Sequence, residues 1–207
     1  MELFPDYTDL PSSPPPQPLA ARMRPDSLKE YLGQEHLIGK GLPLRELVET
    51  ESGLSFILWG PPGTGKTTLA RIAAKLTKSE FHEISAVNAG VADIRKVVQS
   101  ATQVWKTKGS RTILFIDEIH RFNKAQQDSV LPFVENGTIR LIGSTTENPS
   151  FEVIPALRSR CQVFRLEVLD RSSIRNILLS AIADKVKGLG ESRINLQEDA
   201  QELIVSH

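Results

Sequence analysis

Short apolar runs alternate along the chain with segments whose apolar residues recur at helical spacing. Five runs of β type predict strands, at Ser55–Trp59, Glu80–Ser85, Thr112–Ile116, Ile139–Ser144 and Gln162–Leu166. Periodic segments before and between them predict helices, at Leu42–Thr50, Lys66–Thr77, Val91–Thr107 and Lys124–Glu135. Alternating strands and helices are typical of a parallel sheet with helices on both faces. The apolar runs FILW and ILFI agree, because a strand covered on both faces has no polar side.

The pattern changes near Asp170, after which no further strand is predicted. Two amphipathic segments follow, and the second, Leu196–Val205, lies close to the last residue. Residues 1–18 differ again, because they hold six of the 13 prolines and three acidic groups but no basic one. We expect a flexible tail at 1–18, an α/β domain at 19–168 and an incomplete helical domain at 169–207, in a chain that is part of a longer protein. A proline-rich ligand for a partner's aromatic groove is the alternative for the tail.

Composition and charge exclude several classes of protein. A hydrophobic content of 40% with 24% charged residues excludes a wholly disordered or fibrous chain. Lys and Arg total 25 and Asp and Glu total 25, so no chain-wide basic field would attract nucleic acid or a membrane. No apolar run approaches the ~18 residues of a membrane span, and no signal peptide is visible. The single cysteine, Cys161, cannot form an internal disulfide. We therefore expect a cytoplasmic protein without a membrane partner.

A glycine-rich motif follows the first predicted strand. The letters GPPGTGKT, residues 60–67, fit the phosphate-loop pattern G-x-x-x-x-G-K-[ST] and lie between a strand and a helix. Glycines let the loop amides turn inward, and the following helix directs its positive end at the same phosphates. Lys66 is expected to reach the β and γ phosphates, and the Thr67 hydroxyl to bind Mg²⁺. The predicted nucleotide-binding residues are Gly60, Pro61, Pro62, Gly63, Thr64, Gly65, Lys66, Thr67 and Thr68.

An acidic pair ends the third predicted strand. The letters ILFIDEIH place Asp117 at the end of a buried run, where a carboxylate is costly unless it meets a cation. We expect Asp117 to hold Mg²⁺ and Glu118 to deprotonate an attacking water. A small-molecule kinase has no use for such a glutamate. A GTPase would show N-K-x-D, but Asn123 and Lys124 are followed by Ala125 and Gln126. The pattern therefore favours ATP hydrolysis, with ATP and Mg²⁺ as the bound groups.

Two further sets of residues are candidates for the same site. The fourth strand ends in hydroxyl and amide groups, of which Thr146 is the first candidate and Asn148 the second for contacting the attacking water or the γ phosphate. Ordinary turn residues would explain them as well. Arg158 and Arg160 precede the fifth strand. An arginine lent to a neighbouring subunit's triphosphate can raise the rate by roughly 10³ to 10⁵, although exposed arginines are also common at solvated edges.

Taken in order, the motifs GPPGTGKT, FIDE, GSTTENP and SRC resemble those of the AAA+ ATPases, and within them the clamp-loader clade. More narrowly, PLAARMRP, DEIHRFNKAQQDSVLPFVENGTIRLIG and TTENPSFEVIPALRSRC resemble the replication-associated recombination protein A family, relatives of the Werner-helicase-interacting ATPase. The resemblance covers residues 18–207. It implies a three-layer α/β P-loop fold with a five-stranded parallel sheet, followed by the start of an all-α lid domain.

The resemblance also implies roles for single residues. Thr146 matches the first sensor position, and Arg160 matches the finger that acts on the adjacent subunit. Ser85 falls where related ATPases restrain the catalytic glutamate. Residues near the adenine would be Arg24, Leu37 and Ile38. The family's second sensor arginine and its C-terminal oligomerisation domain do not lie within these 207 residues.

By this resemblance the expected function is DNA-stimulated ATP hydrolysis by an oligomer, a tetramer in the family, in replication-fork maintenance, recombination and repair. The alternative is a clamp-loader-like or branch-migration-like ATP-binding subunit that acts mainly through partner proteins. Expected partners are DNA forks, gaps or ends, and single-strand-binding protein or replisome components, near the nucleoid. Residues 158–187 carry seven Lys or Arg against three acids, which suits DNA or a solvated helical face equally well. The four histidines, His36, His82, His120 and His207, have no metal-binding spacing.

Overall fold

The structure is a computed structural model that describes residues 17–50, 54–192 and 194–206. Five parallel strands form one sheet in the order β2-β3-β4-β1-β5. Their bounds are β1 Ser55–Trp59, β2 Glu80–Ser85, β3 Thr112–Asp117, β4 Arg140–Thr145 and β5 Cys161–Arg165. Each lies within one residue of its predicted ends, and the predicted α/β sheet is confirmed. The predicted tail at 1–18 lies almost wholly outside the described residues.

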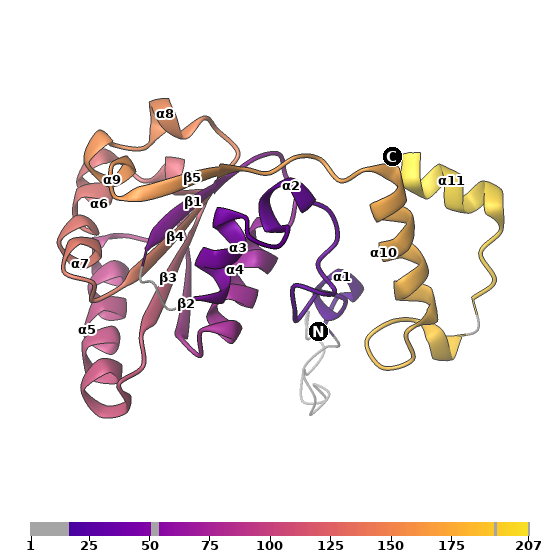
Figure 1. The fold of residues 1–207 in the computed structure, drawn as a ribbon, viewed down its shortest axis with the longest axis horizontal. Coiled ribbons are helices and arrows are strands. Elements are labelled where there is room, and N and C mark those ends of the chain that lie inside the picture. Colours follow the sequence, from indigo (N-terminus) through magenta and orange to yellow (C-terminus); the bar gives the residue numbers. More distant parts are fainter. Residues whose placement is uncertain (1–16, 51–53, 193, 207) are drawn as a thin grey trace, which may run out of the picture.

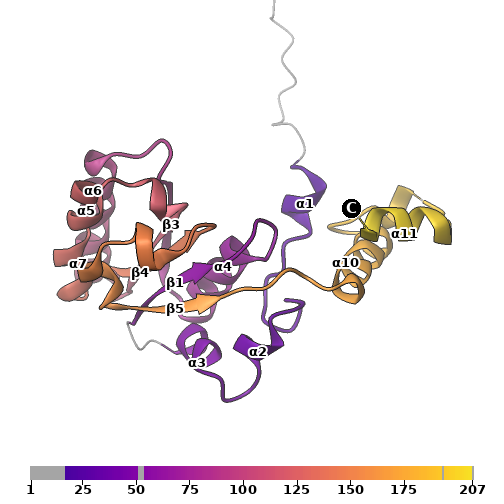
Figure 2. The same ribbon diagram turned by 90° about the horizontal axis from the view of Figure 1, so that it is seen from above.

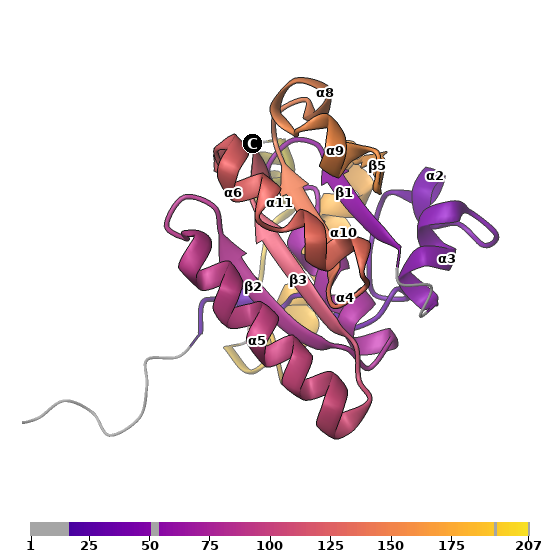
Figure 3. The same cartoon turned by 90° about the vertical axis from the view of Figure 1, so that its left-hand side faces the viewer.

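Helices cover both faces of this sheet (Figures 1 and 3). On one face lie α3 Pro43–Glu49 and α4 Lys66–Leu76, and on the other α5 Val91–Lys108, α6 Lys124–Asp128 and α7 Leu131–Glu135. Successive strand residues face opposite layers, so Phe56 and Leu58 join the core under α4 while Ile57 joins the core under α5. This alternation explains why the strands read as continuous apolar runs.

One predicted helix is two helices in the structure. The segment Lys124–Glu135 was expected to be continuous, but α6 ends at Asp128 and α7 begins at Leu131. Pro132 accounts for the break, because it has no N–H to donate and its ring would clash with the carbonyl group four residues earlier. Four single-turn helices were not predicted, because one turn is too short to show periodicity: α1 Leu19–Arg22, α2 Glu35–Ile38, α8 Pro149–Glu152 and α9 Pro155–Arg158.

Beyond β5 the chain leaves the sheet and forms α10 Arg171–Ala183 and α11 Glu198–Ser206, with short 3-10 turns at Gly190–Ser192 and, after β3, at Ile119–Arg121. These two helices stand on the same side of the sheet as α4 and farther out (Figure 2). The Gln34 side chain binds the backbone of Glu167 twice, donating to its carbonyl at 2.7 Å and accepting from its N–H at 2.9 Å. The chain after β5 is therefore bound as far as Glu167, and Val168–Asp170 connect it to α10. The domain limits at 168 and 169 stay predictions.

Arg140 joins the end of α3 to the sheet. Its guanidinium is buried and donates to the carbonyl groups of Leu47 at 2.6 Å and Leu54 at 2.7 Å, on either side of the connection between α3 and β1. It also lies over the Phe56 ring, 5.3 Å from its centroid. Burial lowers the pKa of Arg140 to about 10, so the charged group depends on these acceptors.

We expect Arg140→Met to lower the free energy of unfolding by on the order of 3 kcal/mol, because buried carbonyl groups would lose their donor. Urea denaturation monitored by circular dichroism measures this change. The matched control is Arg95→Met on the exposed face of α5, for which a change within about 0.5 kcal/mol is expected. Equal midpoints for the two variants would contradict the structural role of Arg140.

Within the described residues, no helix is both long and apolar enough to cross a membrane.

Candidate active site

The phosphate loop connects β1 to α4 and is shaped by close packing at two glycines. Gly65 has a left-handed φ of 93°, and a Cβ there would lie 2.5 Å from the Tyr31 hydroxyl. A Cβ at Gly60 would lie 2.4 Å from the carbonyl oxygen of Leu166. Tyr31 in turn donates from its hydroxyl to the Thr64 carbonyl at 3.2 Å. The loop is therefore held from outside by β5 and by the segment before α2, which leaves its inner side open.

Lys66, the first residue of α4, folds back over its own loop. Its Nζ donates to the carbonyl groups of Gly60 at 2.7 Å and Pro61 at 2.8 Å. Burial lowers the pKa of Lys66, while the negative charges of Glu118 and Asp117 act in the opposite direction. The amine and the two carboxylates are thus close enough to interact electrostatically.

The acidic pair is held by the strand next to it. Ser144, buried at the end of β4, donates from its hydroxyl to Asp117 Oδ1 at 2.5 Å. The same Ser144 oxygen accepts from the Glu118 N–H at 3.2 Å. One small hydroxyl therefore fixes both the metal-binding candidate and the backbone of the catalytic candidate.

Glu118 has a left-handed backbone, with φ of 53°, which directs its side chain away from that of Asp117. Its Oε2 accepts from the Thr146 N–H at 3.2 Å and from the Thr146 hydroxyl at 3.3 Å. His120 Nδ1 lies 3.1 Å from the same oxygen and 3.1 Å from the Thr145 hydroxyl. A carboxylate with fixed neighbours on one side and 29% of its side chain exposed is well placed to accept a proton from water.

The polar residues after β4 do not share this role equally. Thr146, the first sequence candidate, contacts Glu118, whereas Asn148 accepts from the Ser150 N–H and caps α8. Ser85 stands opposite Asp117 in the strand register. Among the described residues, the hydrogen bonds to the Glu118 carboxylate come from Thr146 and not from Ser85, and His120 lies within ion-pair distance of it. The expected Ser85 restraint is therefore not formed in this structure.

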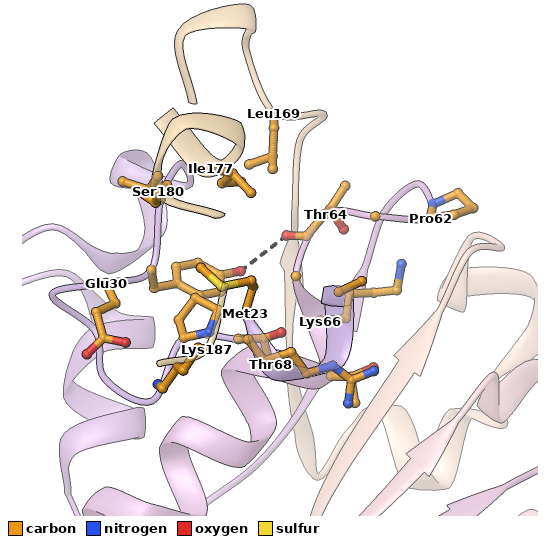
Figure 4. A pocket seen from close by; sticks show the side chains of 18 of the residues that line it. Met23, Glu30, Pro62, Thr64, Lys66, Thr68, Leu169, Ile177, Ser180 and Lys187 are labelled. Atoms are coloured by element: carbon orange, nitrogen blue, oxygen red, sulfur yellow. Dashed lines mark hydrogen bonds between the residues drawn. The ribbon is translucent and has the colours of Figure 1, made fainter. Parts of the chain in front are cut away.

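A cavity of about 860 Å³ is lined by the phosphate loop, Asp117 and Glu118. Lys66 and Thr64 lie on one side of it, and Ile177 and Ser180 of α10 lie on the other (Figure 4). From the predicted set it is lined by Arg24, Pro62, Gly63, Thr64, Gly65, Lys66, Thr67, Thr68, Asp117 and Glu118. Gly60 and Pro61 contribute through the carbonyl groups that bind Lys66. Its volume lies in the range of cavities that hold a nucleotide-sized ligand.

Two sequence candidates for the adenine lie elsewhere. Ile38 is buried, and Leu37 packs beside it, in the core between α3 and α4 rather than in the cavity wall. From the segment before α2, the residues that line the cavity include Tyr31 and Leu32. Ile38 and Leu37 therefore do not line the cavity, and their assignment to the adenine stays a prediction.

Asp26 connects three parts of the chain near this cavity. Its carboxylate pairs with Lys187, which follows α10, at 2.5 Å and with Lys75 of α4 at 3.5 Å. The hydrogen bond and the charge of Lys187, followed by the charge of Lys75, lower the pKa of Asp26. The helices beyond the sheet are thus tied to the segment that lines the cavity.

The two arginines lie outside the cavity of their own chain. Arg160 has 41% of its side chain exposed and pairs with Glu135 at 2.6 Å, while Arg158 donates to the Ser150 carbonyl at 2.5 Å. Neither lines the cavity. Any contact of Arg160 with a triphosphate therefore requires another subunit.

Residues 56–167 match the family described as "ATPase family associated with various cellular activities (AAA)". This chain belongs to the AAA family. Over 188 residues, it is 50% identical to "Replication-associated recombination protein A" of Escherichia coli strain K12, a match covering 91% of this chain and 42% of that protein. It is 45% identical to "ATPase WRNIP1" of Dictyostelium discoideum over 183 residues, which cover 88% of this chain and 21% of that protein.

Among solved structures, the chain resembles the "Thermotoga maritima RuvB Holliday junction branch migration motor". The TM-score is 0.66 with 29% sequence identity, over 89% of this chain and 59% of that one. The chain therefore spans less than half the length of the curated relatives described above. The predicted AAA fold and the resemblance to replication-associated recombination protein A are confirmed.

The cavity of this AAA domain fits a magnesium-bound nucleotide. It combines a glycine-lined loop with a lysine, a hydroxyl from Thr67 and a carboxylate from Asp117, and Mg²⁺ is usually held by one or two protein oxygens together with phosphate oxygens. No cluster of three or more His, Cys, Asp or Glu side chains suited to a metal occurs in the described part of the chain, so a different metal centre has no support there. Mg²⁺, when bound, supplies positive charge that offsets the charge of the phosphates.

Two residues of the AAA site were not identified from the sequence. His120 contacts the acidic pair, and Tyr31 supports the phosphate loop. His120 has a local signal, because it follows Glu118 by two residues within the motif itself. Tyr31 reaches the site through the fold, and its spacing in the chain carries no sign of it. Ser144 is one of the hydroxyl groups at the end of the fourth strand that the sequence places beside the acidic pair, and it contacts Asp117 in the structure.

Proposed function

We propose that this AAA domain hydrolyses ATP with bound Mg²⁺, is stimulated by DNA, and acts as a homo-oligomer in replication-fork maintenance and recombination. One observation carries the proposal: Lys66, Asp117 and Glu118 line a single cavity, and Thr146 holds the Glu118 carboxylate there. A protein acting on DNA forks would work in the nucleoid region of the cytoplasm, and that location is part of the proposal.

The chemistry follows from the positions of these side chains. Water attacks the γ phosphorus while the bond from that phosphorus to the β–γ bridging oxygen breaks, which leaves ADP and phosphate. Glu118 accepts the proton of the attacking water, and the Lys66 amine offsets charge on the phosphate oxygens. Thr146 and His120 keep the carboxylate oriented during this transfer.

The oligomeric part of the proposal rests on Arg160. Arg160 does not line the nucleotide cavity of the same chain. Its side chain is 41% exposed and pairs with Glu135 of α7, so an adjacent subunit could reach it. The names of the relatives support a role in replication-associated recombination. A second candidate, an ATP-binding subunit that acts through partners as in branch migration, is favoured by the likeness to the RuvB motor.

Arg160→Ala separates these candidates. In an active homo-oligomer, ATPase rate per molecule should rise with protein concentration, and the variant should lower the plateau by roughly 10³-fold because the charge supplied across subunits is lost. The rates are measured by phosphate release with and without a forked DNA. Arg158→Ala, two residues away and bound within its own chain, is the matched control and should keep the rise. A rate that stays at zero at every concentration would favour the partner-dependent subunit.

A further inference from the structure

A second cavity, of about 900 Å³, lies between α1, α4 and the start of β2. We call it the basic pocket, because its wall contains one carboxylate, Asp26, and five cationic side chains, Arg22, Arg24, Arg71, Lys75 and Lys78. These residues come from two segments far apart in the sequence, which explains why no charge run marks the pocket. The basic pocket excludes Lys66, Asp117 and Glu118 and is therefore separate from the catalytic groups.

Two of the five cations already have partners. Arg71 pairs with Glu83 at 2.5 Å and lies 5.4 Å from the centroid of the Phe81 ring, while Lys75 pairs with Asp26 at 3.5 Å. Asp26 is shared with Lys187. Within the described residues, the other three, Arg22, Arg24 and Lys78, form no ion pair. The basic pocket therefore has positive charge that the described residues do not balance.

Arg22 has a further unmet requirement. Its Nε atom is buried and has no hydrogen-bond partner in the described structure. A buried donor without an acceptor costs about 1–3 kcal/mol, so such groups generally meet a ligand or an ordered water. The Nε atom is closed off from solvent, so it is not itself a contact point for a ligand, and the attraction for an anion comes from the unpaired charges of Arg22, Arg24 and Lys78.

The stretch that looked basic in the sequence, residues 158–187, is different. Arg160 pairs with Glu135, Arg175 with Glu202 and Lys187 with Asp26. Arg165 lies over the Trp59 ring, 5.2 Å from its centroid. Much of the positive charge of that stretch is therefore used within the chain, and the unpaired charge gathers in the basic pocket instead.

We propose that the basic pocket binds phosphate groups, and that phosphodiester groups of a DNA strand are its occupants. The proposal rests on the DNA partner of the proposed function. A volume of about 900 Å³ exceeds the needs of one phosphate ion and suits a chain of linked phosphates. Arginine and lysine at phosphates are the main source of DNA affinity that does not depend on sequence.

The basic pocket also adjoins the nucleotide. Arg24, Pro25 and Thr68 line both cavities. A single layer of side chains would therefore separate a DNA strand in the basic pocket from a nucleotide in the first cavity. Occupation of the basic pocket fixes the position of these shared residues. This contact gives DNA a direct route to influence the ATPase rate.

The test is the double variant Arg22→Gln/Lys78→Asn, whose two positions line only the basic pocket. Binding of a fluorescent single-stranded oligonucleotide, measured by anisotropy, should weaken about tenfold or more. The slope of log K against log salt should become shallower by about 1.4, because each lost contact to a single strand contributes about 0.7. The unstimulated ATPase rate should stay the same, since neither residue contacts the catalytic groups.

The matched control is Lys106→Gln/Lys108→Gln, which removes the same charge from the exposed end of α5 across the sheet. Three results would overturn DNA as the occupant. They are an equal DNA affinity in the pocket variant and the wild type, a loss of DNA affinity in the control as large as in the pocket variant, and no DNA binding by the wild type. Binding of tripolyphosphate shows whether the pocket prefers a free phosphate chain to DNA. It is measured with a non-hydrolysable ATP analogue present, which occupies the nucleotide cavity. A tripolyphosphate affinity also equal between pocket variant and wild type overturns the phosphate site itself.

Failure of the proposed function gives a different result. A wild-type chain without ATPase activity at any concentration contradicts hydrolysis, yet its DNA affinity and the effect of the double variant can still be measured. Thermal midpoints of the pocket variant and the control, compared with the wild type, show whether a change in binding reflects unfolding.

Discussion

Replacement of Glu118 by Gln is expected to leave nucleotide binding intact and to lower the rate of ATP hydrolysis by roughly 10² to 10⁴-fold. The amide has nearly the same shape as the carboxylate, so its oxygen can still accept from the Thr146 N–H. It cannot take a proton from water at neutral pH, however. The loss should therefore appear in the chemical step and not in affinity.

Single-turnover hydrolysis of ATP measures the chemical step, and titration with a fluorescent ATP analogue measures affinity. Glu147→Gln is the matched control, because this neighbouring carboxylate is exposed and lies outside the cavity. We expect wild-type rates for the control. A Glu118 variant that hydrolyses ATP as fast as the wild type would remove this residue from the catalytic role.

Lys66→Ala should have the second large effect, a loss of nucleotide affinity of about 10² to 10³-fold. The reason is that two charge-assisted hydrogen bonds to phosphate, each worth about 1.5–3 kcal/mol, would be lost, and 1.4 kcal/mol corresponds to a factor of ten. In the free protein, the same amine binds the Gly60 and Pro61 carbonyl groups, so the variant also loses a restraint on the loop. Calorimetric titration with ATP and Mg²⁺ measures the change.

Adenosine serves as the internal control for this variant, because it lacks phosphates and should bind the variant and the wild type equally. Lys96→Ala, on the exposed face of α5, controls for loss of a lysine elsewhere. An unchanged ATP affinity in the Lys66 variant would reject the phosphate-site assignment. A parallel loss of adenosine binding would indicate a damaged cavity instead of a lost phosphate contact.

The strands and the phosphate loop could be predicted because their signals are local. Continuous apolar letters mark strands buried on two faces, and a glycine motif between strand and helix marks the loop. Pro132 was present in the predicted helix at Lys124–Glu135, and its weight was underestimated because the apolar spacing continued across it. Here the steric demand of one residue outweighed the pattern of its neighbours.

The remaining parts of the site depend on contacts between distant segments. Ser144 meets Asp117 only because β4 lies beside β3. Tyr31 meets Gly65 because the chain before α2 wraps over the phosphate loop. Ile38 is predicted at the adenine by its place in a motif, and the fold places it in the core together with residues of α3 and α4. Strand order and helix orientation are tertiary properties, so the spacing of residues in the chain does not reveal them.

The pairing of Gln34 with the Glu167 backbone has a mechanical consequence. Because the chain is bound as far as Glu167 and α10 starts at Arg171, any swing of the outer helices must turn about the backbone of the three residues between them, Val168–Asp170. Leu169, in the middle of this pivot, also lines the cavity that contains the phosphate loop. A ligand that fills the cavity would therefore touch the backbone segment about which the outer helices are free to turn.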